Sequence, residues 1–163
     1  MEKRTSRLTL PNDNEILIVR DFAARKHNLF DAWRKPEWIA RWYGCENQEM
    51  SVCDVDFREG GAWRWGLRDP SDGVDHVFSG VYRAIDRPDR LVFTERYEAI
   101  PGSDHVVALG FEERAGVTTM TMRIIHQSKE GRDGHLSSGM ESGLDPSFDR
   151  LEQVAGSGEG GAS

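Results

Sequence analysis

Six short segments between residues 51 and 126 alternate between apolar and polar side chains. A period of two is typical of β-strands that bury one face. The stretches between them are rich in Gly, Pro, Asp and Ser, which favour tight turns. The predicted strands span residues 51–57, 62–69, 74–85, 91–98, 105–113 and 117–126. Strands at this spacing predict an antiparallel meander.

The chain before the meander combines one strand with two short helices. The β-branched run at 15–22 predicts a first strand. Apolar residues three and four apart predict a helix over 25–33 and another over 36–44. Pro36 is placed to begin the second helix, and Gly44 is placed to end it. We expect Trp38 and Trp42 of this helix to close one end of the interior.

After the meander the apolar period changes to that of a helix. The residues of the apolar stripe are Leu136, Met140, Leu144, Phe148, Leu151 and Val154. They predict a long helix over about 130–154, with a kink at Pro146 or a new segment beginning near Asp145. An amphipathic helix of this kind can cover the open face of a curved sheet.

The domain organisation follows from these elements. A chain of 163 residues favours one domain. Residues 1–13 are polar and are expected to form a flexible N-terminus, followed by a single domain over 14–155. The glycine-rich residues 156–163 are expected to be a disordered tail.

Composition excludes several classes of partner. The net charge of -7 disfavours nucleic acid, which requires a basic surface. No run approaches the ~18 apolar residues of a membrane span, and the first residues have no apolar core for a signal peptide. The two cysteines, Cys45 and Cys53, do not make a disulfide framework. Reduced thiols and a cytoplasmic location are therefore expected.

The order of these elements, with several short segments, resembles the helix-grip superfamily called SRPBCC, which includes START and polyketide-cyclase domains. Within it, the chain looks like the activator of heat-shock-protein-90 ATPase homologue family. The segments that carry the resemblance are RDFAA (20–24), FDAWRKPEWIARWYG (30–44), VDFREGG (55–61), GVYRAIDRPDRLVFTE (80–95), TTMTM (118–122) and GMESGLDPSFDRLEQV (139–154). The resemblance implies an α+β fold in which a curved seven-stranded antiparallel sheet grips the C-terminal helix around a hydrophobic cavity.

The chain also departs from the family pattern at three positions. Lys35 stands where the family often has an aspartate before the proline, which removes a capping acceptor. Leu144 replaces a tryptophan common after Gly143, and Pro146 replaces a helix former. The co-chaperone for which the family is named has a further N-terminal domain, so the resemblance does not predict chaperone activation. Asp56 and Arg58 match the family pattern and are interpreted as a structural charge pair.

The candidate ligand-binding residues share the predicted inward faces of the strands and of the last helix. Most are aromatic or apolar, as ligand sites usually are. His76 and Glu95 are the polar candidates, and methionines add an adaptable surface. The set is Trp63, Trp65, His76, Phe78, Tyr82, Phe93, Glu95, Tyr97, Met120, Met122, Met140, Leu144 and Phe148. Ordinary core packing is the alternative for the apolar members, and solvent exposure is the alternative for His76 and Glu95.

Sequence motifs for metals, cofactors and nucleophiles are not found. The five histidines are His27, His76, His105, His126 and His135. None forms a close metal-spaced pair, and no CxxC or HExxH occurs, so neither a metal site nor a cofactor is expected. The match of residues 156–161 to GxGxxG follows a helix and opens none, which disfavours a dinucleotide site. No GxSxG or Walker loop occurs.

The favoured function is binding of a small hydrophobic molecule between the sheet and the helix over 130–154. The alternative is an enzyme, a cyclase or hydrolase, in which His76 or Glu95 performs acid–base chemistry. A third reading is a protein-interaction module, which an exposed apolar patch would support. Whether the protein is an enzyme, and whether it forms a homodimer, are left open by the sequence.

Overall fold

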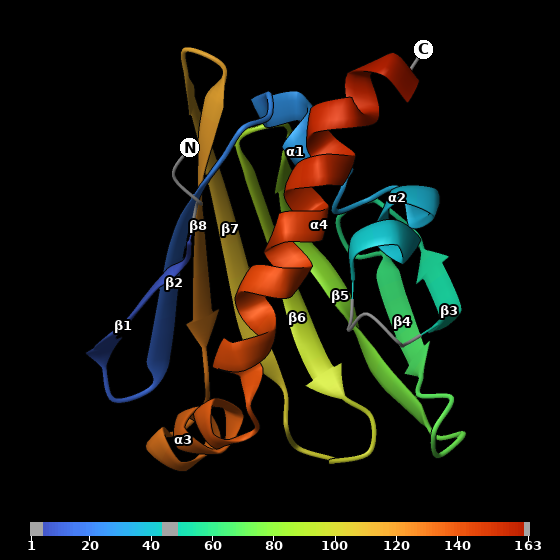
Figure 1. Ribbon diagram of the computed structural model, residues 1–163. Coiled ribbons are helices and arrows are strands. Elements are labelled where there is room, and N and C mark those ends of the chain that lie inside the picture. The colour runs from blue at the N-terminus through green and yellow to red at the C-terminus, as the bar shows by residue number, and fades with distance from the viewer. Residues whose placement is uncertain (1–4, 44–48, 162–163) are drawn as a thin grey trace.

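The computed structural model describes residues 5–43 and 49–161, with side chains to residue 156. The described residues form one antiparallel sheet of eight strands in the order β1-β2-β8-β7-β6-β5-β4-β3 (Figure 1). The strands are β1 (Arg7–Asn12), β2 (Glu15–Phe22), β3 (Glu49–Val55), β4 (Ala62–Arg68), β5 (Asp75–Asp86), β6 (Arg90–Tyr97), β7 (His105–Arg114) and β8 (Val117–Ile125). The helices are α1 (Lys26–Asp31), α2 (Pro36–Trp42), α3 (Lys129–Ser137) and α4 (Met140–Gly161).

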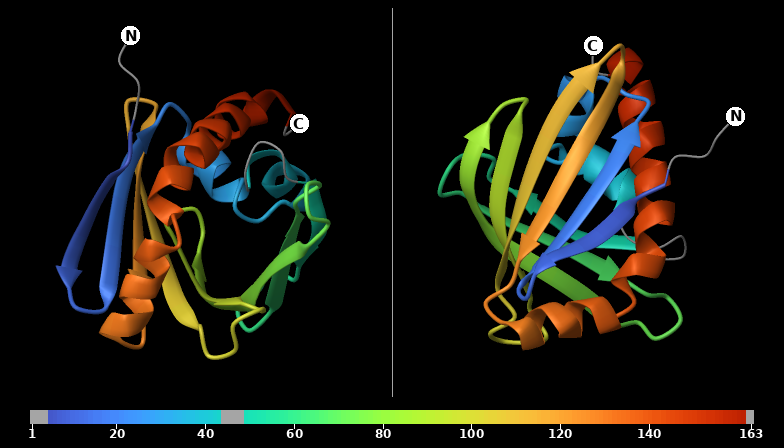
Figure 2. Two further views of the ribbon diagram at one scale, coloured as in Figure 1. Left: turned by 60° about the horizontal axis from the view of Figure 1, so that its bottom comes forward. Right: turned by 90° about the vertical axis from the view of Figure 1, so that its left-hand side faces the viewer.

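The sheet curves around α4, which lies across its concave face (Figure 2). The predicted α+β class, with a large antiparallel sheet and a long C-terminal helix, is confirmed. Strand alternation builds the concave face, because every second residue of β2, β7 and β8 is buried. The core therefore lies between this face and the helices, and it includes Ile18, Phe22, Leu109 and Met120.

Strand β1 corrects the expectation of a flexible N-terminus before residue 14. Residues 7–12 pair with β2 as an edge strand, so the sheet has one strand more than the seven implied by the resemblance. The segment is mostly exposed, and only Leu8 packs partly against the core. Backbone pairing, rather than apolar alternation, accounts for this strand, which explains why the sequence pattern does not reveal it.

A glycine pair turns the chain between β3 and β4. Gly60 has a φ of +85°, which glycine adopts without strain. A Cβ on Gly61 would lie 2.1 Å from the carbonyl oxygen of Asp56, so the next residue must also lack a side chain. Asp56 and Arg58 form the predicted charge pair beside this turn, with Nε 3.0 Å from Oδ2 and both side chains exposed.

The two short helices fill the end of the interior next to β3 and β4 with tryptophan rings. The rings of Trp33 and Trp42 lie 4.7 Å apart between centroids, and Nε1 of Trp42 donates to the carbonyl oxygen of Ala32. Trp38 is also buried. Lys35 occupies the N-cap of α2 and makes no side-chain capping bond, as its side chain predicts. The predicted helix end at Gly44 lies outside the described residues.

The C-terminal helical region is broken at Gly139, not near Asp145 as predicted. Gly139 has a φ of +88° and separates α3 from α4. Pro146 lies inside the second turn of α4, where its missing N–H leaves the carbonyl of Ser142 without the usual bond to the residue four positions later. The helix also continues to Gly161, beyond the tail boundary expected at residue 156.

A buried arginine fixes α4 to the sheet. Arg20 of β2 is 1% exposed, although its neighbours on the same face are apolar. Its guanidinium lies near three carboxylates of α4, those of Asp145, Asp149 and Glu152. These acids recur at steps of four and three residues, so they share one face of the helix. The ion pairs therefore set which face of α4 points toward β2.

A membrane-spanning helix is not found among the described residues, since none of their helices is both long and apolar enough.

Candidate functional site

The interior is densely packed at the end near α1 and α2. Trp63, Tyr82 and Phe93 of the sheet and Phe148 of α4 are each at most 4% exposed. The ring of Trp63 lies 5.5 Å from that of Phe93, edge to face. These four predicted ligand-binding residues therefore contribute to a closed core in this structure.

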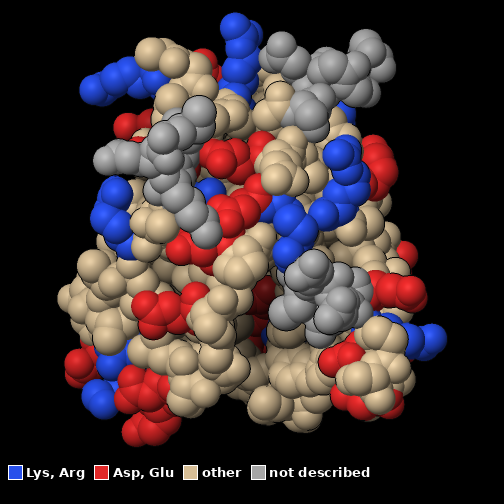
Figure 3. All heavy atoms as spheres, viewed as in Figure 1, with Lys and Arg blue, Asp and Glu red and all other residues tan. Residues whose placement is uncertain are grey.

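The other end of the interior is less completely closed. Phe78 and Tyr97 on the sheet and Met140 and Leu144 on α4 are half-buried, although all four lie against the core or its rings. Tyr43, at the end of α2, packs its ring 4.8 Å from that of Trp65. Figure 3 shows a hollow on this face beside the lower part of α4, with acidic side-chain atoms visible inside it.

Beside Tyr43, the indole of Trp65 carries a buried polar atom. Nε1 of Trp65 has no partner among the described residues, whereas Nε1 of the neighbouring Trp63 donates to the carbonyl oxygen of Thr94 at 3.1 Å. The hydroxyl of Tyr82 is also buried and unpartnered, at the more densely packed end. Leaving a buried donor unpaired costs about 1–3 kcal/mol. The site thus retains hydrogen-bonding capacity that the protein itself does not use.

His76 and Glu95 were predicted as the polar residues of one pocket, but they have different partners. Nδ1 of His76 lies 2.8 Å from the hydroxyl of Tyr97, and the two rings are stacked. Oε1 of Glu95 lies 2.7 Å from Nε2 of His105, its direct cross-strand partner. The two predicted residues therefore belong to two separate polar pairs.

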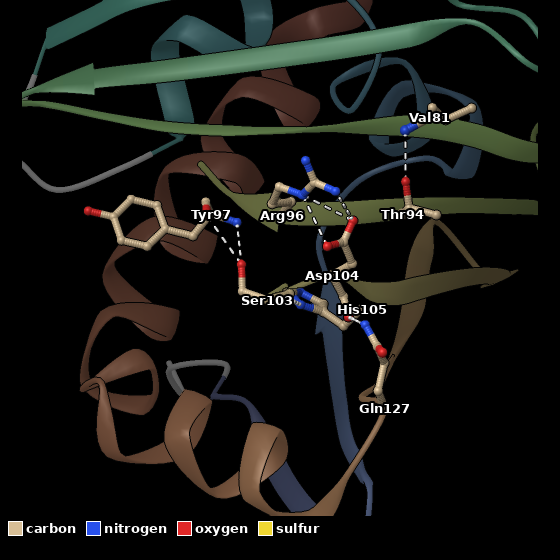
Figure 4. Close-up of polar contacts among 8 residues, drawn as sticks. All are labelled: Val81, Thr94, Arg96, Tyr97, Ser103, Asp104, His105 and Gln127. Carbon is tan, nitrogen blue, oxygen red and sulfur yellow. Dashed lines mark hydrogen bonds and ion pairs between the residues drawn. The ribbon is translucent and has the colours of Figure 1, made fainter. Parts of the chain in front are cut away.

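His105 is held from both sides by hydrogen-bond acceptors. Its Nδ1 lies 3.0 Å from the carbonyl oxygen of Ser103, and its Nε2 faces Glu95. The Ser103 hydroxyl is bonded in turn to the backbone of Tyr97, as Figure 4 shows. In the same view, the Tyr97 ring points away from the Arg96–Asp104 ion pair. The turn between β6 and β7 thus fixes the orientation of the His105 ring.

Two further histidines complete a cluster with His105. His126 directly follows β8, and His135 lies on α3. Nε2 of His126 lies 2.9 Å from Nδ1 of His135. The spacing of these histidines along the chain does not predict the cluster, because it depends on how α3 folds over the end of the sheet.

The three imidazoles of the cluster differ in the direction of their pKa shifts. Burial acts to lower the pKa of His105, but the hydrogen bond and charge of Glu95 outweigh it and raise that pKa. Burial lowers the pKa of His126 to about 4, and the charges of His105 and His135 act in the same direction. Burial, and then the charge of His105, lowers the pKa of His135. The positive charge is therefore favoured on His105, next to Glu95.

Tyr43, whose ring packs against Trp65, is also affected by the charge of Glu95. Burial raises the pKa of Tyr43 well above its usual range, and the charge of Glu95 adds to this effect. The phenol therefore stays protonated and can donate a hydrogen bond. Sequence patterns did not single out Tyr43, since it lies at a helix end rather than on an alternating strand.

The remaining predicted site residues are two methionines of β8. Met120 is fully buried and Met122 is 9% exposed, so both contribute to the core. Both lie on the concave face, because their positions alternate with the less buried residues of β8.

A family model described as Activator of Hsp90 ATPase homolog 1-like protein matches residues 23–156. The chain belongs to this family. As an AHSA1-like member of the SRPBCC superfamily, it has the fold that the sequence resemblance implies. The matched residues include both short helices, the meander and most of α4.

Solved structures share the fold of this AHSA1-like domain along nearly its whole length. A protein from Rhodobacter sphaeroides is 22% identical, with a TM-score of 0.85 over 92% of this chain and 97% of that chain. A protein from Nitrosomonas europaea is 21% identical, with a TM-score of 0.78 over 90% and 97%. An AHSA1-like protein from Aeromonas hydrophila is 17% identical, with a TM-score of 0.69 over 90% and 95%. At these identities the likeness establishes the fold alone.

None of the curated proteins compared with the chain matches it.

Proposed function

We propose that this AHSA1-like domain binds a small, mainly apolar molecule in the hollow between the concave face of the sheet and the first turns of α4. The observation that carries the proposal is the buried indole N–H of Trp65, which has no partner among the described residues. Half-buried Phe78 and Leu144 provide apolar surface nearby, on the sheet and on the helix. Ligand sites combine such apolar surface with a few polar groups.

The surroundings define the chemistry of the molecule. Contact with Phe78, Tyr97 and Leu144 favours a ring or a short aliphatic chain, whose burial contributes about 25 cal/mol per Å². The Trp65 N–H requires a hydrogen-bond acceptor, such as a carbonyl or ether oxygen. A molecule with one acceptor in an otherwise apolar body fits both requirements.

Binding can be tested with a fluorescent anilinonaphthalene sulfonate, together with native mass spectrometry of the protein as purified. We expect one saturable site. Phe78→Ala and Leu144→Gln should each weaken binding about tenfold, which corresponds to about 1.4 kcal/mol. Val81→Ala is the matched control, because Val81 lies on the same strand but is 41% exposed.

Near-ultraviolet circular dichroism should show native packing in all three variants. Equal affinities for the three variants, or no saturable site in the unaltered protein, would contradict the proposal.

One observation favours a second candidate, an acid–base enzyme acting on the bound molecule. The Glu95 carboxylate and the His105 imidazole converge at 2.7 Å on the concave face. A positioned pair of this kind can transfer a proton, which contributes about 10²–10⁴-fold to a rate. Hydrolysis of p-nitrophenyl esters tests this candidate. Turnover that Glu95→Gln lowers about 100-fold would support it, and no turnover above buffer would count against it.

The interaction-module reading gains no comparable support. The exposed large apolar side chains among the described residues are Leu10, Val74, Val81 and Ile100. They come from β1, from β5 and from two separate turns, and no other feature of the described surface singles out a partner.

A further inference from the structure

Three imidazole rings from separate parts of the chain meet where β7 begins, β8 ends and α3 crosses the end of the sheet. One ring nitrogen from each of His105, His126 and His135 lies within 4.8 Å of the other two. His105 and His126 are 9% and 7% exposed. Polar rings buried this closely together require partners that satisfy their nitrogens.

The hydrogen bonds indicate which nitrogen of each ring would face an ion. The Ser103 carbonyl can only accept, so Nδ1 of His105 donates to it, and the opposite nitrogen, Nε2, faces Glu95 and the cluster. Between His126 and His135, one nitrogen donates and the other accepts. A neutral imidazole has a lone pair on the ring nitrogen that carries no proton, and that nitrogen can bind a metal ion.

We infer that His105, His126 and His135 form a binding site for one divalent transition-metal ion of the zinc class, with the Glu95 carboxylate as a fourth ligand. Three imidazoles and a carboxylate are a ligand set that zinc prefers. The contact between Nδ1 of His105 and the Ser103 carbonyl is the kind of outer bond that orients a metal-binding histidine. The inference does not depend on the proposed apolar molecule.

The distances are close to those that a metal ion requires. Zinc–nitrogen bonds of about 2.0–2.1 Å place tetrahedral ligand atoms about 3.3 Å apart. The nitrogens of His126 and His135 are 2.9 Å apart, and all three histidine nitrogens lie within 4.8 Å. Small ring rotations are therefore enough to assemble the site. The Glu95 oxygen already touches the His105 nitrogen that would bind the ion.

The surrounding charges are compatible with a cation. The charge of Arg132, on the same helix as His135, acts on His126, and Arg132 pairs with Asp133 at 2.9 Å. Asp104 is held by Arg96 on the other side of the turn. The Glu95 carboxylate can therefore compensate the ion directly.

Cobalt(II) is a suitable probe, because it replaces zinc and four-coordinate Co²⁺ absorbs visible light much more strongly than the hydrated ion. The full-length protein should be treated with a chelator, dialysed and then titrated with Co²⁺. We expect the strong bands to saturate at one equivalent and to disappear when Zn²⁺ is added. His126→Ala and His135→Ala should each weaken binding at least about 100-fold.

His27→Ala is the matched control, because His27 is exposed on α1 and lies outside the cluster; its Co²⁺ affinity should be unchanged. His126→Gln provides a second variant that retains a polar side chain if the alanine variant does not fold. The spectrum of hydrated Co²⁺ throughout the titration of the unaltered protein would overturn the inference. Equal affinities for the His27 and His126 variants would also overturn it.

Discussion

Nη2 of Arg20 lies 2.9 Å from Oδ1 of Asp149, joining the second strand to the last helix. Asp145 and Glu152 lie 3.7 Å from the same guanidinium. A charge that is 1% exposed is stable only when opposite charges accompany it into the interior. This contact therefore joins β2, near the start of the chain, to α4, near its end.

Replacing Arg20 by methionine should lower the free energy of unfolding by about 3 kcal/mol, because three clustered carboxylates then lose their common cation. Urea titration measures this change. Arg123→Met is the matched control, since Arg123 is 43% exposed and pairs with Glu15 near the surface. The control should lose less than about 1 kcal/mol. Equal losses of unfolding free energy in the two variants would show that the ion pairs of Arg20 do not hold α4 against the sheet.

Gly80 should tolerate no side chain. A Cβ there would lie 1.7 Å from the backbone oxygen of Thr94 and 2.7 Å from Nε1 of Trp63. Gly80→Ala should therefore destabilise the protein by about 3 kcal/mol or more. Gly110→Ala, on β7, is the comparison, because no atom lies within 4 Å of its added Cβ. Thermal unfolding should place this second variant within about 0.5 kcal/mol of the unaltered protein.

Cys53 should react slowly with alkylating reagents. Burial raises the pKa of its thiol to about 11, and the charges of Asp54 and Glu37 add to this effect. In a Cys45→Ser variant at pH 8, iodoacetamide should modify the folded protein about 100-fold more slowly than the urea-unfolded chain, because the thiolate is the reactive form.

The rate of this alkylation should depend on pH differently in the folded and the unfolded protein. The rate for the folded protein should keep rising up to about pH 11, whereas that for the unfolded chain should level off near its ordinary pKa of 9.0. Coincident pH profiles for the two states would contradict the effect of partial burial on this thiol.

Zinc should raise the melting temperature if the histidine cluster binds it. At a free concentration 100 times its dissociation constant, a ligand that binds only the folded state stabilises that state by about 2.7 kcal/mol. For a chain of this size that corresponds to about 5–10 °C. His135→Ala should show no such rise, while His27→Ala should show the full rise. A similar rise in both variants would point to zinc binding elsewhere.

Most strands were predictable, because alternation and turn chemistry act within a few residues. β2 spans Glu15–Phe22, the range that the sequence pattern predicts. β1 was missed because pairing with β2, and not burial, defines it. The break at Gly139 was missed because the apolar stripe continues across it from Leu136 to Met140.

The candidate site was predictable only in part. Alternation indicates that Phe78 and Glu95 can share a face, but it does not show which partners they meet. Predicting the pairing of Glu95 with His105 requires knowledge of the register between β6 and β7. Predicting the contact of His135 with His126 requires knowledge of the path of α3. Both relationships depend on the tertiary structure and not on the local sequence.

The pairing of β2 with β8 has a consequence for synthesis in the cell. The partner of Ile18 on the neighbouring strand is Met122, roughly a hundred residues later in the chain. At roughly 5–20 residues per second, a nascent chain holds this apolar strand without its partner for roughly 5–20 s. The ribosome must therefore release most of the polypeptide before β2 can pair with β8, and β2 is the segment that a chaperone would find exposed during that interval.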